Sequence, residues 1–127
     1  MSARVVYEYA IIRVVPKVER EEFLNVGVIL FSKRAKYLDL RYELNESRLS
    51  CFSSELDLEQ VREHLRGWEM VCRGGAEGGA IGQLKMAVRF RWLVANRSTI
   101  IQSSRVHPGL CTDPATVLVD LYRRYVE

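Results

Sequence analysis

The sequence predicts an α+β fold in which residues 1–127 form a single domain, with an antiparallel sheet of about four strands and two or three helices packed on one side. Three observations support this class. Three β-rich segments come first, a strongly amphipathic helix follows them, and a second capped helix ends the chain. The length fits one domain, and 48% hydrophobic with 28% charged residues is the composition of a soluble globular protein that buries a core unaided.

Residues 5–15 are predicted to be the central strand, because the run VVYEYAIIRVV is β-branched and aromatic and both of its alternating faces are largely apolar. Pro16 ends this strand, since proline cannot donate to a sheet ladder. Residues 25–32 form a second buried strand, in which Gly27 marks a bulge, a close approach of another backbone, or plain tight packing. Residues 37–44 alternate regularly between polar and apolar side chains, which predicts a strand with one wet face.

The clearest helix spans about residues 57–73. Asp57 is a good N-cap and Gln60 follows three residues later, as in a capping box. The apolar residues then recur at steps of three and four, which predicts one buried face, and Cys72 is the last of them. Gly74 and Gly75 end the helix.

The second half of the chain is less regular. Residues 74–82 form a glycine-rich loop, which we interpret as a flexible connection because it lacks the spacing of known phosphate-binding loops. Residues 84–94 alternate like a strand but consist of good helix formers, and a short helix is favoured. Residues 98–104 are predicted to be a short strand, and Asp113 with Pro114 begins a C-terminal helix.

Several classes of protein are excluded or disfavoured. No apolar run approaches the roughly 20 residues of a membrane-spanning helix, and Glu8 interrupts the one candidate for a signal sequence. Three widely spaced cysteines without a CxxC pair indicate reduced thiols, so we expect a cytoplasmic protein. With two histidines and no compact carboxylate cluster, neither a metal site nor a cofactor is predicted.

The net charge of +3 is unevenly distributed. Residues 78–112 carry five basic and no acidic side chains, whereas the other 92 residues are slightly acidic. Arginine supplies 15 of the 19 basic residues, which favours bidentate recognition of carboxylates or phosphates. The candidate ligand-binding residues in and around this basic segment are Arg89, Arg91, Arg97, Ser98, Thr99, Gln102, Arg105 and His107, and Lys85 adds a fifth cation.

His107 and Cys111 are the only candidates for catalysis, because a cysteine with a histidine is the minimum for a thiol nucleophile and its base. Their spacing would pair them on a helix, but Pro108 and Gly109 lie between them. A turn would be needed to bring the two side chains together. A structural cysteine and an ordinary turn histidine are the simpler interpretation.

Two blocks carry a family resemblance: YEYAIIRVVPKVEREEFLNVGVILF at residues 7–31 and RFRWLVANRSTIIQSSRVHPGLCTDP at residues 89–114. Together they resemble the bacterial domain-of-unknown-function family 3037 over nearly the whole chain, although residues 33–80 carry little of the likeness. Proline is common in that family at the position of Asn96, so the turn there can differ. The resemblance implies no activity, cofactor or catalytic residue. It implies a small bacterial protein often encoded beside a kinase-like protein of the HipA type, which is therefore a possible partner.

Three functions follow as hypotheses. The first is a non-enzymatic binding domain whose Arg-rich segment, residues 85–107, docks an acidic or phosphorylated partner. The second is an enzyme that acts on a phosphorylated or nucleotide substrate, with the arginines as an anion clamp and His107 or Cys111 as the reactive group. The third is a single-stranded nucleic-acid binding module, because arginines alternate with aromatic residues in this segment.

Overall fold

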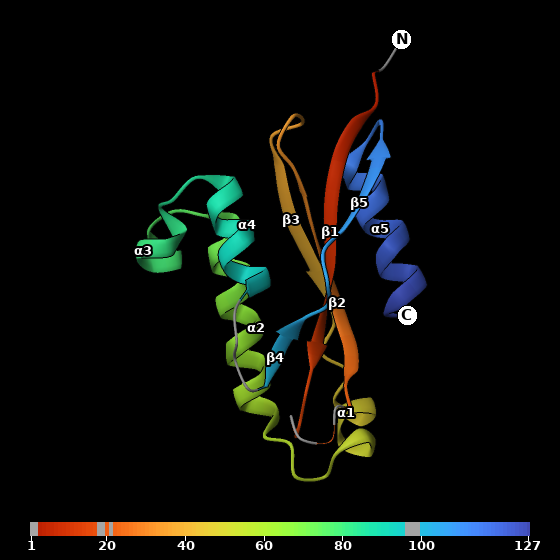
Figure 1. The fold of residues 1–127 in the computed structure, drawn as a ribbon. Helices are drawn as coiled ribbons and strands as arrows, with labels where there is room; N and C mark the ends of the chain where they lie inside the picture. The colour runs from red at the N-terminus through yellow and green to blue at the C-terminus, as the bar shows by residue number, and fades with distance from the viewer. Residues whose placement is uncertain (1–2, 18–19, 21, 96–99) are drawn as a thin grey trace.

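A computed structural model describes residues 3–17, 20, 22–95 and 100–127. Its antiparallel sheet contains β1 (Val5–Val14), β2 (Leu24–Ser32), β3 (Tyr37–Tyr42), β4 (Ile101–Ser103) and β5 (His107–Cys111). The strand order is β3-β2-β1-β4 (Figure 1). Strand β4 pairs with the last residues of β1, and β5 pairs with the first half of β1. The prediction that β1 is the central strand is therefore confirmed.

The helices lie on both faces of this sheet. They are α1 (Glu46–Phe52), α2 (Leu58–Arg73), the 3-10 turn η2 (Ala76–Gly78), α3 (Gly79–Gly82), α4 (Met86–Ala95) and α5 (Pro114–Tyr125). Figure 1 shows α2 and α4 on one side of the strands and α5 on the other. The α+β class with an antiparallel sheet is confirmed, with five strands in place of about four and more helices than expected. The expectation that all helices pack on one side is corrected by the position of α5.

The composition of β1 and β2 explains why both faces are covered. Successive side chains of a strand point to opposite faces, and these two strands are apolar at nearly every position. Ile12 and Ile29 therefore belong to a core beneath α2 and α4. Their neighbours Ile11 and Val28 belong to a second core, which Leu118 and other residues of α5 close. A helix layer on one side alone would leave the second apolar face in water.

Gly27 lies where β2 passes closest to its neighbours. A Cβ atom at this position would lie 2.7 Å from the carbonyl oxygen of Arg41 and 3.2 Å from the side chain of Ile12. The register between β1 and β2 shifts one step further on, where Val26 is the extra residue of a bulge. The close approach at Gly27 and the bulge at Val26 therefore occur side by side in β2.

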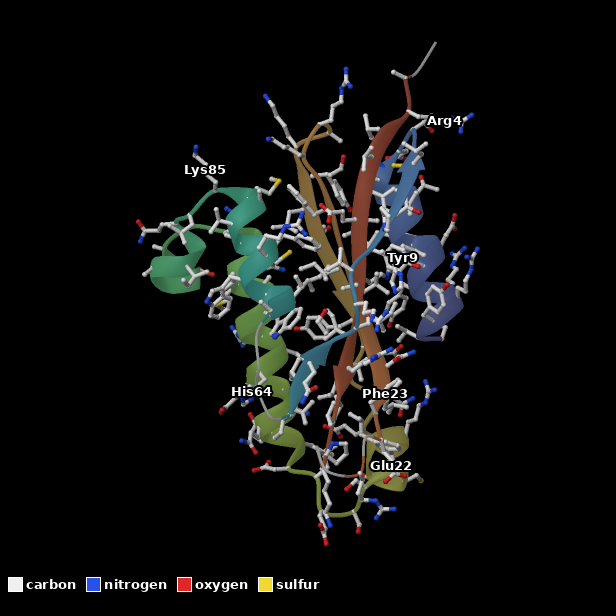
Figure 2. The ribbon with its side chains drawn as sticks, viewed as in Figure 1. Arg4, Tyr9, Glu22, Phe23, His64 and Lys85 are labelled. Atoms are coloured by element: carbon white, nitrogen blue, oxygen red, sulfur yellow. The ribbon has the colours of Figure 1, made fainter. Side chains whose placement is uncertain are left out.

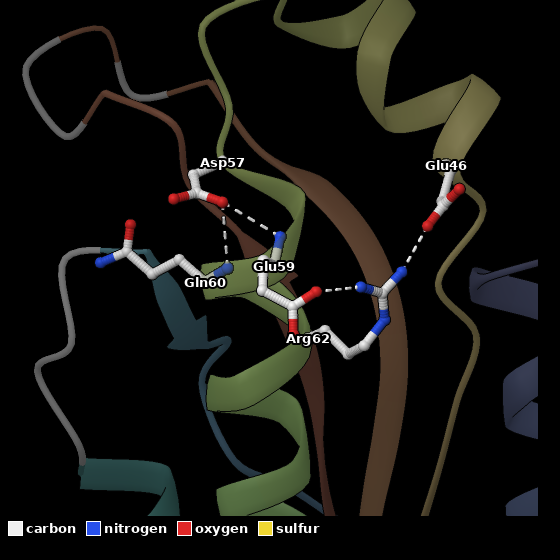
Figure 3. A network of polar contacts seen from close by, with 5 residues as sticks. All are labelled: Glu46, Asp57, Glu59, Gln60 and Arg62. Carbon is white, nitrogen blue, oxygen red and sulfur yellow. Dashed lines mark hydrogen bonds and ion pairs between the residues drawn. The ribbon is translucent and has the colours of Figure 1, made fainter.

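The predicted helix 57–73 is α2, and its polar start is joined to α1 (Figure 3). The Asp57 carboxylate accepts hydrogen bonds from the backbone N–H groups of Glu59 and Gln60, at 3.1 and 3.3 Å. Arg62 forms an ion pair with Glu59 one turn away and another with Glu46 at the start of α1. These contacts fix the loop between α1 and α2. At the other end, Gly74 terminates α2 as predicted, with a positive φ of 82°.

Two segments that the sequence predicts as a loop or leaves undecided are helical in the structure. Residues 84–94 are mostly helix α4, which confirms the favoured alternative, with Phe90 and Leu93 buried. The glycine-rich loop is folded into η2 and α3 rather than being a simple connection. It is closed by a hydrogen bond of 2.7 Å from the Gly75 N–H to the Gly82 carbonyl. A Cβ at Gly82 would lie 2.6 Å from the Gly75 oxygen, so this closure requires glycine.

Candidate binding surfaces

The structure divides the basic segment between the two faces of the sheet. Arg89 and Arg91 lie on α4, which covers the face with Ile12 and Ile29. Gln102 and His107 lie on β4 and β5, opposite residues of β1 whose side chains point to the α5 face. Figure 2 shows the same division, with Lys85 on the α4 side and Tyr9 on the α5 side. Arg89 and Arg91 therefore lie on the opposite face of the sheet from Gln102 and His107.

Arg89 is used within the fold. Its guanidinium donates to the carbonyl oxygen of Leu84 at 2.9 Å and lies against Gly74, where a Cβ would be 2.8 Å from Nη1. This contact explains why a residue without a side chain ends α2. An arginine thus lies against the first glycine of the glycine-rich loop, held by a carbonyl oxygen and by backbone.

Arg91 is neutralised by a carboxylate. Both of its terminal nitrogens donate to Glu8 on β1, at 2.9 and 2.6 Å. Glu8 and Arg91 are 83 residues apart in sequence, so their pairing is visible only in the folded chain. The two candidate cations of α4 are thus engaged within the protein.

Gln102 lies on β4, and Ser104 and Arg105 lie in the connection between β4 and β5. Ser104 is 8% exposed, and its hydroxyl accepts from the Ile11 N–H at 2.8 Å and donates to the Arg105 carbonyl at 2.8 Å. Arg105 follows it with an exposed side chain. Gln102 is half-buried and pairs with Arg13 across the sheet. Arg97, Ser98 and Thr99, together with the turn at Asn96, lie outside the described residues.

His107 and Cys111 are not brought together. They begin and end β5, opposite Tyr9 and Val5 of β1. Four steps along a strand at about 3.3 Å each separate two residues by roughly 13 Å, far beyond a hydrogen bond. Burial, with a smaller contribution from the Asp113 carboxylate, raises the pKa of the Cys111 thiol. This thiol therefore lacks both a paired base and an environment that favours the thiolate.

A row of aromatic rings crosses the α5 face beside β5. The Tyr9 ring centroid lies 5.3 Å from that of His107, 6.1 Å from that of Tyr7 and 6.4 Å from that of Tyr125. His107 is exposed, and 39% of Tyr125 is exposed. Burial raises the pKa of the Tyr9 hydroxyl, and its hydrogen bond with Tyr125 adds to the shift. We call Tyr7, Tyr9, His107, Tyr125 and the two flanking arginines Arg13 and Arg124 the Tyr9 face.

The two arginines of the Tyr9 face lie on aromatic rings. The Arg13 guanidinium stands 3.9 Å above the Phe23 ring, and that of Arg124 is 6.0 Å from the Tyr125 ring. Figure 2 places Phe23 and Tyr9 on the same side of the molecule. Burial lowers the pKa of Arg13, and its Nε has no hydrogen-bond partner within the described ranges. The Tyr9 face therefore carries two arginines, each beside an aromatic ring.

Helix α5 covers the Tyr9 face only in part, and Tyr7 and Tyr9 are half-buried. Leu118, Leu121 and Tyr122 of α5 pack on Val28 and Leu30 of β2, so this helix is centred over β2 rather than over β5. The sequence contains one signal for this surface. Tyr7 and Tyr9 are two residues apart in a predicted strand, which places both rings on one face. Their meeting with His107 and Tyr125 depends on strand pairing and on α5.

Two kinds of feature are absent from the described part of the chain. It contains no group of three or more His, Cys, Asp or Glu side chains placed to hold a metal ion. None of its helices has the length and hydropathy needed to cross a membrane.

The fold and these surfaces define a small antiparallel α+β domain with a central strand covered on both faces. The chain belongs to a family of proteins of unknown function, DUF3037, whose model matches residues 9–126. This match confirms the resemblance seen in the two sequence blocks. No curated protein and no solved structure matched the chain.

Proposed function

We propose that the protein is a non-enzymatic binding domain that docks an acidic or phosphorylated segment of a partner protein on the Tyr9 face. The observation that carries the proposal is the contact of the Tyr9 ring with His107 and Tyr125, with Arg124 beside it. Tyrosine and arginine are the residues that most often anchor protein interfaces, because they bury a large area at a small cost in conformational entropy.

The surface differs from the one expected from the sequence, while the class of function is the same. Arg89 and Arg91 are engaged with Leu84 and Glu8, whereas Arg105 and His107 are exposed beside β1. Forked guanidinium groups suit carboxylate and phosphate oxygens. The resemblance to a family often encoded beside HipA-like kinases makes such a kinase the first partner to test. A cytoplasmic location fits the three free cysteines.

The proposal is tested by fluorescence anisotropy with a fluorescein-labelled peptide of alternating phosphoserine and glutamate. The double variant His107→Ala with Arg124→Ala should bind this peptide about tenfold more weakly, a loss of about 1.4 kcal/mol. The matched control is Arg34→Ala, which removes an exposed arginine outside the Tyr9 face. Binding by the unchanged protein should weaken as salt increases.

Three results would overturn the proposal. The first is that the phosphopeptide does not bind at low salt, and the second is that the double variant and the Arg34→Ala control bind it equally well. A labelled oligothymidylate that binds more tightly than the peptide, and loses affinity in the same double variant, would favour the single-stranded nucleic-acid function instead. Capture of a co-expressed HipA-like kinase by the unchanged protein, but not by the double variant, would support the partner.

A further inference from the structure

A groove runs along the outer side of α2, opposite to the Tyr9 face. It has a volume of about 490 Å³ and is walled by α2, by the η2 and α3 turns, and by Trp92 of α4. Trp92 is 42% exposed although it is a large aromatic residue. His64 marks the α2 side of the groove, far from Tyr9 in Figure 2. The volume is in the range of grooves that hold one or two side chains or a small ligand.

The polar groups that line the groove attract cations. Glu63 and Glu77 carry carboxylates, and no lysine or arginine is among the described residues that line the groove. The Nδ1 of His64 lies 2.8 Å from the Gln60 carbonyl oxygen, which can only accept a hydrogen bond. When the imidazole is neutral, this contact has Nδ1 as the donor and leaves Nε2 as an acceptor. Beside them the exposed Trp92 ring offers the kind of face that binds ammonium and guanidinium groups.

Gly67 lines the groove, and packing within the fold does not require a glycine there. It lies in the interior of α2, where glycine is less favourable than alanine for a helix. A Cβ at this position would meet no heavy atom within 4 Å. Gly78, in contrast, approaches α2 so closely that a Cβ would lie 2.9 Å from the Met70 oxygen. The fold therefore explains Gly78 by packing but gives no packing reason for Gly67, and the space beside Gly67 belongs to the groove.

We infer that this groove binds a segment of a partner protein that presents a lysine or arginine next to an apolar side chain. The cation lies against Trp92 and is paired by Glu63 and Glu77, and the apolar neighbour covers Met70 and Val71 beside Gly67. Charge complementarity selects this occupant, because the carboxylates of Glu63 and Glu77 attract a cation and repel an acidic segment. The inference is independent of the Tyr9 face.

The experiment uses two fluorescein-labelled peptides, one that repeats Leu-Arg-Gly and one that repeats Leu-Glu-Gly. The Leu-Arg-Gly peptide should bind, shift the tryptophan emission to shorter wavelength and lose affinity with salt. The shift should disappear in Trp92→Phe, because Trp68 is already buried at 3% exposure. Gly67→Leu, which fills the groove, should weaken binding by about tenfold or more, whereas Gly67→Ala, which adds a single methyl group, should weaken binding less and raise the midpoint of urea unfolding.

Charge is tested by Glu63→Gln with Glu77→Gln, which should weaken binding several-fold and reduce its dependence on salt. Urea unfolding of Gly67→Leu verifies that the variant is folded. The inference is overturned if the Leu-Arg-Gly peptide does not bind, or if Gly67→Leu and the double glutamine variant bind it as the unchanged protein does. It is also overturned if Leu-Glu-Gly competes equally for the groove, or if sedimentation shows a self-association that Gly67→Leu abolishes, because a second copy would then be the occupant.

Discussion

The hydroxyl of Ser104 accepts a hydrogen bond of 2.8 Å from the backbone N–H of Ile11. This contact lies between the part of β1 that pairs with β4 and the part that pairs with β5. The Ser104 N–H in turn donates to the Ile11 carbonyl at 2.9 Å. Ile11 is in the middle of the central strand, and a buried N–H without a partner there would be costly. One serine side chain thus completes the ladder of β1 across the break between two short strands.

The first prediction is that Ser104→Ala destabilises the protein. The free energy of unfolding should fall by about 1–3 kcal/mol, since the buried Ile11 N–H loses its acceptor. Urea unfolding measures the change. The control is Ser103→Ala, which removes the hydrogen bond that the Ser103 hydroxyl donates to the Ser104 carbonyl. This change should cost about 1 kcal/mol or less. Equal effects of the two substitutions would contradict the assigned role of Ser104.

The second prediction concerns Gly109, which lies beneath the Tyr7 ring. A Cβ at this position would be 2.4 Å from the Tyr7 hydroxyl. Gly109→Ala should therefore push the ring away and destabilise the protein by about 1–2 kcal/mol. In a Tyr7→Ala background the same change should cost much less, and a double-mutant cycle in urea measures the coupling. If the cost is the same in both backgrounds, the steric explanation is wrong.

The third prediction is a loss of stability in alkali through two tyrosines. Tyr42 donates to Glu69 at 2.8 Å and Tyr122 donates to Glu43 at 3.1 Å. Burial, followed by these hydrogen bonds to carboxylates, raises the pKa of each phenol from 10.0 to about 12. The folded state thus retains protons that the unfolded state releases, so the stabilisation is fully present below pH 10 and is lost between about pH 10 and 12.

This alkaline loss is measured by urea unfolding between pH 7 and 12. Tyr122→Phe should lower stability at pH 7, because Glu43 loses a donor, and should flatten the decline above pH 10. Below pH 9 the pH dependence of this variant should match that of the unchanged protein. A decline above pH 10 that is equally steep in Tyr122→Phe would count against the role of this phenol.

The fourth prediction separates the three thiols. Cys51 is exposed, whereas Cys72 and Cys111 are 2% and 7% exposed. Burial raises the pKa of the Cys72 thiol to about 12. At pH 8 one thiol per chain should react rapidly with Ellman's reagent, and all three should react in urea. Cys51→Ser should abolish the rapid phase. A rapid phase that persists in Cys51→Ser and disappears in Cys111→Ser would revive the catalytic-cysteine hypothesis.

Two missed elements show where sequence patterns are weak. The short helix α1 buries Leu49 alone among its residues, so it has no apolar periodicity to detect. Distant contacts hold it in place, including the hydrogen bond from Arg48 to the Val126 carbonyl at 3.0 Å. Strand β5 contains Pro108 and Gly109, which usually interrupt strands. It forms because β1 offers a complete partner, and its position at the sheet edge tolerates a proline.

The sequence by itself determined what depends on neighbours along the chain: the apolar runs of β1 and β2, the capped helix that begins after Asp57, and the helix that begins at Pro114. Strand and helix periodicities and caps act within a few residues, so they are visible in the letters. Only the tertiary structure decided that Glu8 neutralises Arg91 and that Tyr9 meets His107 and Tyr125. These partners are set by which face each strand presents and by where α5 packs, and no local pattern encodes either.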